Sequence, residues 1–491
     1  MTTKNLAAAA LIGAWVMLTT GCGGSSSSSA APQTSSRTVG GTVSGLSGTV
    51  VLQNNGADNL SLTGNGAFAF LTPVAQGGTY NATVLTQPAT QTCVVTNGSA
   101  TMGGANITNV GLTCSNNTTT LAISVSNIAL SVTGLTAYGI SGTPSSGAAR
   151  SITVTNTGSD TAINMAVSSP TWPAGTTSST TCGSTLTASS SCTITITPGS
   201  TASSDGTSPC SVGTAPLPGT IQVAGDNTNT VSSNAVVLSY GCIYQGGYVY
   251  AFDDTTLTSA SVGGKVAATA DQAAASPNGI VWSSNGSGGI GLTDTSYDAI
   301  PGVDETSTLS GGSPTYASFS AGFASTYTNP NPFSAASFAS CDGAIDGLCN
   351  TNNIAAFYNQ FITNNTTASG GATPFTASPG PTSTTDYAAG LCKATINGYS
   401  DWYLPAQCEM GYGSTNCGTA GVPALQNMQS NLVEFNGLNL LTGAYWSSTQ
   451  ASTSGFAVAW AHLFAGGGGS LLINVSKAQQ AGVRCSRALG P

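Results

Sequence analysis

Charged side chains are scarce in this chain of 491 residues. Lys, Arg, Asp and Glu together make up 5% of it, whereas an average soluble domain contains about a quarter. The few charges are acidic on balance, with 8 Lys and Arg against 17 Asp and Glu and a net charge of −9. Nucleic-acid binding needs a basic stripe or patch, so the composition excludes nucleic acid as a partner.

Catalytic and metal-binding motifs are equally sparse. His462 is the only histidine, and the 13 cysteines include no Cys-x-x-Cys pair, so the ligand spacing of a structural zinc site is missing. No Gly-x-Ser-x-Gly elbow, phosphate loop or dinucleotide fingerprint stands out. Three carboxylate pairs satisfy the composition of a glycosidase site, but solvated loops are the favoured explanation for them. These pairs are Asp253 with Asp254, Asp294 with Asp298, and Asp304 with Glu305. We therefore expect no enzyme, with a glycan hydrolase or a relative of formylglycine-generating enzymes as the alternative.

The N-terminus has the pattern of an export signal. One positive charge at Lys4 precedes an apolar run from Leu6 to Leu18, and small residues lead to Cys22. The run is shorter than the roughly 20 residues of a spanning helix. Small residues directly before a cysteine resemble the lipobox of bacterial lipoproteins. That resemblance makes residues 1–22 a signal peptide ending in the lipidated Cys22, and Gly23 after it implies the outer membrane. Residues 23–37 are rich in Ser, Gly and Pro and predict a disordered tether.

The remaining twelve cysteines form an even set. Export places them in an oxidising compartment, where disulfides persist. Their spacing favours local pairing, although sequence alone does not fix connectivity. The expected pairs are Cys93–Cys114, Cys182–Cys192, Cys210–Cys242, Cys341–Cys349, Cys392–Cys485 and Cys408–Cys417.

Residues 38–115 predict a β-sandwich module. Short β-rich segments alternate with turn residues, and both Asn54-Asn-Gly56 and Asn65-Gly66 are hairpin signals. Residues 116–242 predict a second β module. Here Ala149–Ser159 and Cys182–Pro198 resemble immunoglobulin-like modules of bacterial surface proteins, in which the first string is a core strand and the second a hairpin. The two modules are expected to be Ig-like or prealbumin-like spacers.

Residues 243–491 differ, because helical periodicity appears there beside the strand-like segments. Ile354, Phe357, Tyr358 and Phe361 share a helical face behind Asn352 and Asn353, which are candidate caps. The overall prediction is a mostly β protein whose last domain is α+β.

Three strings in this last domain carry a resemblance to a family. They are Gly398-Tyr-Ser-Asp-Trp-Tyr-Leu-Pro405, Tyr445-Trp-Ser-Ser-Thr449 and Gly482-Val-Arg-Cys-Ser-Arg487. In this order they resemble the Lcl C-terminal domain family, named after a collagen-like adhesin associated with glycosaminoglycan and host-surface binding. The resemblance implies an exported binding domain, with a corner held by Leu404-Pro405 and Glu409 as in C-type-lectin-like folds. Tyr403 and Ala406 replace the family's Arg and Thr.

The charge of this domain argues against a polysulfated ligand. Residues 243–491 carry 5 Lys and Arg against 13 Asp and Glu, a net of −8. Such a ligand is repelled in bulk unless Lys477, Arg484 and Arg487 form a local positive spot. Neutral sugars remain compatible, since aromatic faces stack on them and amides bind their hydroxyls. The expected ligand-facing residues are Trp460, His462, Gly466 and Gly469.

One metal hypothesis remains. Asp294, Asp298, Asp304 and Glu305 offer the loop oxygens that Ca²⁺ prefers; otherwise no cofactor is expected. The sequence thus predicts a lipid-anchored protein of the outer membrane and cell surface, an adhesin that binds glycans or host matrix. A structural envelope or filament subunit, with self-association, is the alternative.

Overall fold

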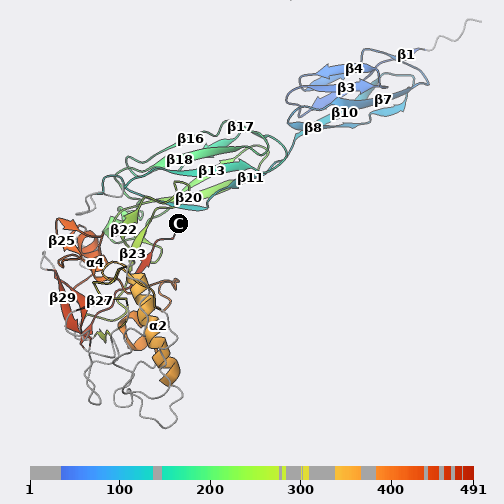
Figure 1. The fold of residues 1–491 in the computed structure, drawn as a ribbon. Helices are drawn as coiled ribbons and strands as arrows, with labels where there is room; N and C mark the ends of the chain where they lie inside the picture. The colour runs from blue at the N-terminus through green and yellow to red at the C-terminus, as the bar shows by residue number, and fades with distance from the viewer. Residues whose placement is uncertain are drawn as a thin grey trace, which may run out of the picture. The chain divides into compact units, whose positions relative to one another are not determined.

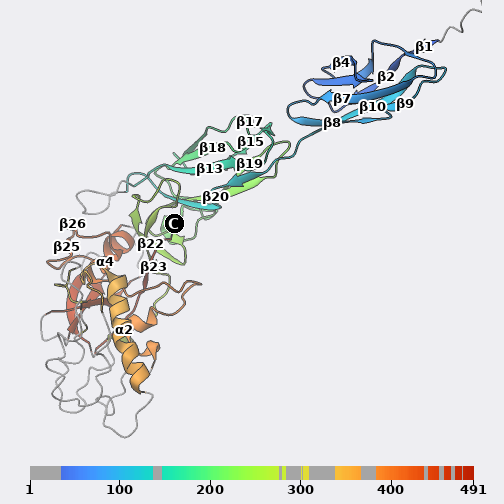
Figure 2. The same cartoon turned by 45° about the vertical axis from the view of Figure 1, so that its right-hand side comes forward.

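The computed structural model describes residues 35–135, 146–275, 279–282, 300, 302–308, 338–365, 383–435, 441–452, 458–465, 470–477 and 479–490. These residues are mostly β, as the composition predicts (Figures 1 and 2). They form two compact units, which we call unit 1 (up to Asn116) and unit 2 (from Asn117). Within the described residues, none of the helices has the length and apolar character needed to cross a bilayer.

Unit 1 is a β-sandwich of two four-stranded sheets. One sheet has the order β5-β2-β10-β8 and the other the order β4-β3-β7-β9, beside the pair β1-β6. Buried side chains of both sheets, such as Val39, Leu52 and Val110, make one core. The strands are β1 (Ser36–Arg37), β2 (Val39–Ser44), β3 (Val50–Asn54), β4 (Asp58–Leu62), β5 (Gly66–Ala69), β6 (Val74–Ala75), β7 (Thr79–Thr86), β8 (Gln91–Thr96), β9 (Ser99–Thr101) and β10 (Ile107–Asn116).

One of the two predicted hairpin turns is confirmed. Asn55 and Gly56 have φ values of 50° and 72° and connect β3 to β4, because both positions of this tight turn need a positive φ. The prediction at Asn65-Gly66 is wrong, since β4 and β5 lie in different sheets. The side chain of Asn65 instead bonds the backbone N–H and carbonyl of Leu46.

The predicted tether is shorter than expected at its C-terminal end. Ser36 and Arg37 pair with Ala75 and Val74 as strand β1 of the sandwich, so residues 36–37 belong to the fold. Cys22 and the rest of the predicted signal and tether up to residue 34 lie outside the described residues.

Unit 2 begins with a second sandwich. Its sheets have the orders β11-β13-β18-β16 and β12-β20-β19-β15, beside the pair β14-β17. The strands are β11 (Leu121–Ile123), β12 (Asn127–Ser131), β13 (Arg150–Asn156), β14 (Ala162–Ile163), β15 (Ala166–Ser168), β16 (Thr177–Thr180), β17 (Thr185–Leu186), β18 (Ser191–Thr197), β19 (Gly219–Ala224) and β20 (Val231–Leu238), with the 3-10 turn η1 (Cys210–Val212).

Buried and outward-facing side chains alternate along β13 and β18, and this alternation explains how their sheet contributes to the core. Ile152 and Val154 of β13 and Ile194 and Ile196 of β18 are buried, while their neighbours face outward, as expected for half-buried strands. The first immunoglobulin-like string is therefore a core strand, as the resemblance implies. The second string is not a hairpin, because β17 and β18 pair with different strands.

The last part of unit 2 combines sheets and helices. Its sheets are β21-β22-β23-β31, β27-β28-β29, β24-β30 and β25-β26. The strands are β21 (Ile243–Tyr244), β22 (Gly247–Asp253), β23 (Gly263–Ala268), β24 (Ile280–Val281), β25 (Gly418–Thr419), β26 (Val422–Pro423), β27 (Gly443–Gln450), β28 (Val458–Phe464), β29 (Leu471–Ser476), β30 (Gln480–Ala481) and β31 (Ser486–Ala488). The helices are α2 (Gly347–Asn365), η3 (Thr384–Asp386), α3 (Ala388–Leu391), α4 (Gln407–Met410) and the π-helical η4 (Gln429–Glu434).

Helix α2 starts earlier than predicted. Asn352 and Asn353 lie inside it rather than at its cap. The capping residue is Asp346, whose carboxylate accepts a hydrogen bond from the Cys349 N–H at 2.9 Å, the usual bond of an N-cap residue. The amide of Asn353 instead bonds the backbone of Ala339.

All twelve cysteines after Cys22 form disulfides, in the pairs that the spacing predicted. Cys93–Cys114 links neighbouring strands of unit 1. The other five bridges lie in unit 2, and Cys392–Cys485 closes the longest loop, with a separation of 93 residues. The remaining pairs are Cys182–Cys192, Cys210–Cys242, Cys341–Cys349 and Cys408–Cys417.

The predicted boundary between residues 242 and 243 does not separate two cores. Ala129 and Val237 of the second sandwich pack in one buried cluster with Val249, Phe252 and Val262 of the last domain. Backbone bonds cross the same boundary, from Ser151 N–H to the Thr258 carbonyl at 2.8 Å and from Val262 N–H to the Ala129 carbonyl at 2.9 Å. The second module and the last domain are therefore one compact unit.

A buried ion pair lies at this junction. Arg150, at the start of β13, donates from Nη2 to Asp254 at 2.9 Å, and both side chains are almost fully buried. Its Nη1 donates to the carbonyls of Leu257 and Ala260 at 2.9 and 2.6 Å. The second oxygen of Asp254 accepts from Ser131 Oγ at 2.5 Å. A buried pair is tolerated when hydrogen bonds satisfy the remaining groups. Here both sides of the junction supply such bonds, although Nε of Arg150 has no partner among the described residues.

Removing one partner of this pair should be strongly destabilising. In Arg150→Met, Asp254 keeps its charge without a counter-ion, and we expect a loss of about 3–5 kcal/mol. The double variant Arg150→Met with Asp254→Asn, which removes the charge and retains a bond to Ser131, should lose less. Urea unfolding of the mature chain measures both. Equal stability of the single variant and the parent would contradict this role of the pair.

Candidate functional site

The predicted ligand-facing residues lie on the central strand of the sheet β27-β28-β29. Trp460 and His462 are two positions apart on β28 and therefore lie on the same face. Trp460 is half-buried, and His462 is fully buried. The prediction that His462 faces a ligand is wrong, because its side chain is fully buried among Phe464, Gly411 and Gln429. Gly466 and Gly469 lie outside the described residues.

His462 packs between an aromatic ring and a helix end. Its ring centre lies 4.3 Å from that of Phe464, and the backbone of Gly411, just after α4, approaches it from the other side. Burial lowers the pKa of His462 from 6.5 to about 3. The imidazole is therefore neutral at physiological pH, and it has no carboxylate partner among the described residues.

This burial predicts a pH dependence of stability. The unfolded chain takes up a proton at His462 near pH 6.5, whereas the folded chain does so only near pH 3. The contribution of neutral His462 is therefore complete above pH 6.5 and is lost as pH falls toward 3. At about 1.4 kcal/mol per pKa unit, the total loss is on the order of 5 kcal/mol. Chemical unfolding from pH 7 to 3 should show a steeper decline for the parent than for His462→Gln; parallel curves would contradict it.

Gly411 is needed because His462 occupies the space a side chain would take. A Cβ at Gly411 would lie 2.2 Å from Cε1 of His462 and 2.5 Å from Oε1 of Gln429. Gly411→Ala should therefore cost about 1–3 kcal/mol by overpacking. The double variant with His462→Ala should recover part of that loss. Gly421→Ala is the control, since a Cβ there meets nothing within 4 Å. Equal melting temperatures of both alanine variants would count against this packing.

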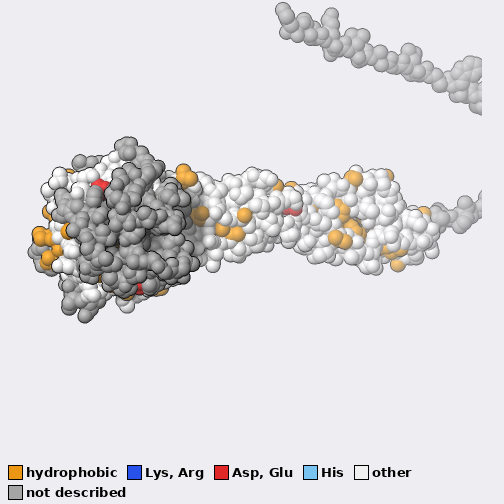
Figure 3. All heavy atoms as spheres, turned by 60° about the horizontal axis from the view of Figure 1, so that its bottom comes forward, with side chains coloured by type: hydrophobic (Ala, Val, Ile, Leu, Met, Phe, Trp, Pro, Cys, Tyr) orange, Lys and Arg blue, Asp and Glu red, His pale blue; other side chains and the backbone are white. Residues whose placement is uncertain are grey.

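The expected positive spot does not form on the surface. Lys477, Arg484 and Arg487 are each buried. Lys477 lies 4.4 Å from the centre of the Trp282 ring, and Arg484 and Arg487 pair with Asp271 and Asp401. These cations stabilise the fold and are not presented to a sulfated ligand. Among the described residues that Figure 3 leaves visible, few side chains are charged.

The corner at Leu404-Pro405 is held by Glu409, as the resemblance implies. One Glu409 oxygen accepts from the Ala406 N–H at 2.8 Å, and the other accepts from the Tyr403 hydroxyl at 2.9 Å and from Lys265 Nζ. Burial and then the Glu409 charge raise the pKa of Tyr403 well above its usual value, so the phenol remains a donor. Tyr403 thus donates to Glu409 at the position where the resembled motif has an Arg, and Lys265 from β23 supplies a positive charge.

The calcium hypothesis is tested only in part. Asp304 accepts from the backbone and hydroxyl of Thr306 and from the hydroxyl of Ser307. Glu305 accepts from Ser452 N–H and Oγ, both at 2.7 Å. Asp294 and Asp298 lie outside the described residues. The described half of the cluster therefore has protein partners, and a calcium site stays a prediction.

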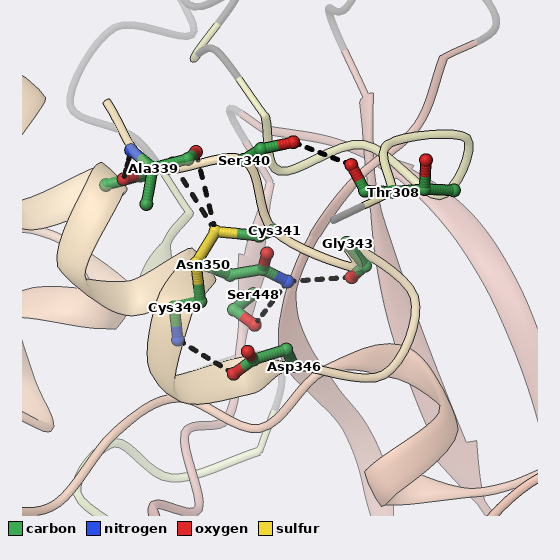
Figure 4. The surroundings of a disulfide bond; sticks show 10 residues. Thr308, Ala339, Ser340, Cys341, Gly343, Asp346, Cys349, Asn350 and Ser448 are labelled. Carbon is green, nitrogen blue, oxygen red and sulfur yellow. Dashed lines mark hydrogen bonds between the residues drawn. A yellow bond between two sulfur atoms is a disulfide. The ribbon is translucent and has the colours of Figure 1, made fainter. Parts of the chain in front are cut away.

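The loop closed by Cys341–Cys349 is a structural turn at the start of α2 (Figure 4). Asp346 inside the loop caps the helix. The amide of Asn350 bonds the Gly343 carbonyl at 2.7 Å and the Ser448 hydroxyl at 3.2 Å. The loop is thereby fixed to β27. Because its cysteines and the other ten are paired, the described residues leave no free thiol for chemistry of the formylglycine-generating type.

The candidate carboxylate pair Asp253 and Asp254 is also structural. Asp254 belongs to the ion pair with Arg150, and Asp253 accepts from the backbone and hydroxyl of Thr255. The two carboxylates have separate partners, so they do not form the facing pair of a glycosidase.

A groove that the sequence did not indicate lies where the second sandwich meets the last domain. Its volume is about 340 Å³. Its lining is apolar with a few amides, and no charged side chain belongs to it. The lining residues are Asn127, Ile128, Ala215, Pro216, Pro218, Asn234, Val236, Ile243, Tyr244 and Gln245. They come from three distant segments that only the tertiary fold brings together, so no local pattern predicts the groove.

Comparison with known proteins adds little. No family model matches the sequence, and no curated protein matches it; the Lcl resemblance therefore stays a prediction. Domains 4 and 5 of the S-layer protein SbsC are 14% identical over 34% of this chain and 69% of that chain, with a TM-score of 0.17. A protein of unknown function from Porphyromonas gingivalis W83 is 6% identical over 39% of this chain and 86% of that chain, with a TM-score of 0.17. Likenesses this weak carry no inference about fold or function.

Proposed function

We propose that this chain is a lipid-anchored cell-surface adhesin that binds neutral glycans or glycan-bearing matrix through unit 2. In this proposal Cys22 carries the lipid, and unit 1 acts as a spacer between the membrane and unit 2. The six disulfides support the proposed extracytoplasmic location, because such bonds persist in oxidising compartments.

The joint between the second sandwich and the last domain is the observation that carries the proposal. A shared core, backbone bonds and the Arg150–Asp254 pair fix the two parts to each other. Domains of one chain joined by small polar contacts move relative to one another by default. A fixed joint suits a protein that must hold a binding surface in place.

The charges favour a neutral ligand. Residues 243–491 carry a net charge of −8, and Lys477, Arg484 and Arg487 are buried within the fold. A polyanion would meet an acidic domain without an exposed counter-charge from these three residues. Neutral sugars avoid this repulsion.

The groove at the joint is the best-supported place for such a ligand. Ligand sites are concave, mostly apolar and supplied with a few polar groups, and they often lie where domains meet. Tyr244 offers a half-buried aromatic ring, and Asn127 and Asn234 offer amides on the sandwich side. Trp460, also half-buried, remains the alternative place from the sequence.

A binding screen tests the function. The mature chain from residue 23 is applied to neutral glycans and matrix proteins, with and without calcium. We expect saturable binding to at least one of them, and Tyr244→Ala should weaken it about tenfold or more, a change of about 1.4 kcal/mol. Tyr412→Ala is the matched control, because Tyr412 is half-buried but does not line the groove.

The possible outcomes of this screen distinguish the proposed adhesin function from the proposed binding site in the groove. Absence of saturable binding to every probe would remove the adhesin proposal. Binding that Tyr244→Ala leaves unchanged would retain the function and reject the groove. Protease shaving of intact cells tests the location: release of fragments of unit 2 is expected, and full protection would contradict surface exposure.

A further inference from the structure

Two buried polar side chains, Gln429 and His462, lie at the end of helix α4, and a third, Gln407, belongs to the helix itself. Gln407, Gln429 and His462 are each fully buried. Five of their polar atoms have no hydrogen-bond partner among the described residues, namely Oε1 and Nε2 of Gln407, Oε1 of Gln429, and Nδ1 and Nε2 of His462. A buried polar atom left unpaired costs about 1–3 kcal/mol. Such a concentration in one place needs a physical explanation.

The orientation of the Gln429 amide is fixed by its neighbour Glu434. The amide nitrogen of Gln429 donates to a carboxylate oxygen of Glu434 at 2.8 Å, and the same oxygen accepts from the Tyr412 hydroxyl at 2.6 Å. An ionised carboxylate only accepts, so the amide cannot be turned around. Its oxygen therefore points away from Glu434, toward the interior.

That oxygen and the imidazole share one small region. Measured from the Cβ position of Gly411, Oε1 of Gln429 lies at 2.5 Å and Nδ1 of His462 at 2.8 Å. Gln407 belongs to the same turn, since its carbonyl accepts from the Gly411 N–H at 3.2 Å. The backbone of Gly411 thus brings the polar atoms of β28 and η4 to one end of α4.

The donors and acceptors of these groups are complementary to water. A neutral imidazole has one donor and one acceptor, and the amide oxygen of Gln429 can only accept. Gln429 can therefore pair with at most one imidazole nitrogen, and the other nitrogen needs a donor. Buried waters make about three hydrogen bonds to groups of this kind.

We propose that an ordered water molecule is bound at the end of α4, where it bridges Oε1 of Gln429 and the imidazole of His462. This water links β28 to η4 and gives the buried imidazole its hydrogen bonds. The site takes a neutral ligand that both donates and accepts hydrogen bonds, and it is independent of the proposed adhesin function.

The single histidine makes this inference testable by NMR. In the mature chain labelled with ¹⁵N, the His462 ring is the only imidazole to observe. We expect one neutral tautomer and a cross-relaxation signal between a ring proton and a long-lived water. A crystal structure should show density for the water within hydrogen-bonding distance of both residues. Absence of the water in both measurements, or a direct bond between Gln429 and His462, would overturn the proposal.

A double-mutant cycle gives a second measurement. Gln429→Met and His462→Phe each remove one side of the bridge while keeping the approximate volume. We expect each to lower the melting temperature by about 2 °C or more, with the double variant less affected than the sum. Gln480→Met, at an exposed position, is the control. If the two apolar variants raise the melting temperature and their effects add, the atoms are unpaired and no water bridges them.

Discussion

The ion pair between Arg150 and Asp254 is the interaction on which the architecture of unit 2 depends. Removing two ions from water is unfavourable unless good geometry and additional hydrogen bonds compensate for the lost hydration. Here Ser131 and two backbone carbonyls provide that compensation, and they come from both sides of the joint. These bonds form only when the sandwich and the last domain are in register, so the pair links the placement of the two parts to the stability of unit 2.

Most other cations of unit 2 are also buried or half-buried within the fold, and the exception is the exposed Lys393. Lys265, Lys477, Arg484 and Arg487 each contact a carboxylate, an aromatic ring or a carbonyl within the fold. In a chain with 8 Lys and Arg in total, this leaves very few for the surface. Solubility then depends on hydroxyl and amide groups, and interactions with other molecules depend on shape and hydrogen bonding more than on long-range attraction.

The sequence was sufficient for what depends on local pattern. The immunoglobulin-like resemblance located the core strand β13, the Asn55-Gly56 turn predicted the first hairpin, and spacing predicted the cysteine pairs. The sequence did not predict features that are formed by segments distant from one another in the chain. The environment of His462 is set by Gly411 and Gln429 as well as by β28, so strand alternation alone could not reveal that it is buried. The groove likewise has walls from three segments, and Arg150 gave no sign of a partner about a hundred positions away.

The pairing of β23 with β31 has a consequence for how the protein is made. Strand β23 (Gly263–Ala268) is completed on one side by β31 (Ser486–Ala488), and Cys485 beside it bonds Cys392. A ribosome delivers residues in order, so the partner of β23 emerges about 220 residues later. The hairpin of β22 and β23 can form early, but the fourth strand of this sheet is added only after residues 486–488 have been synthesised.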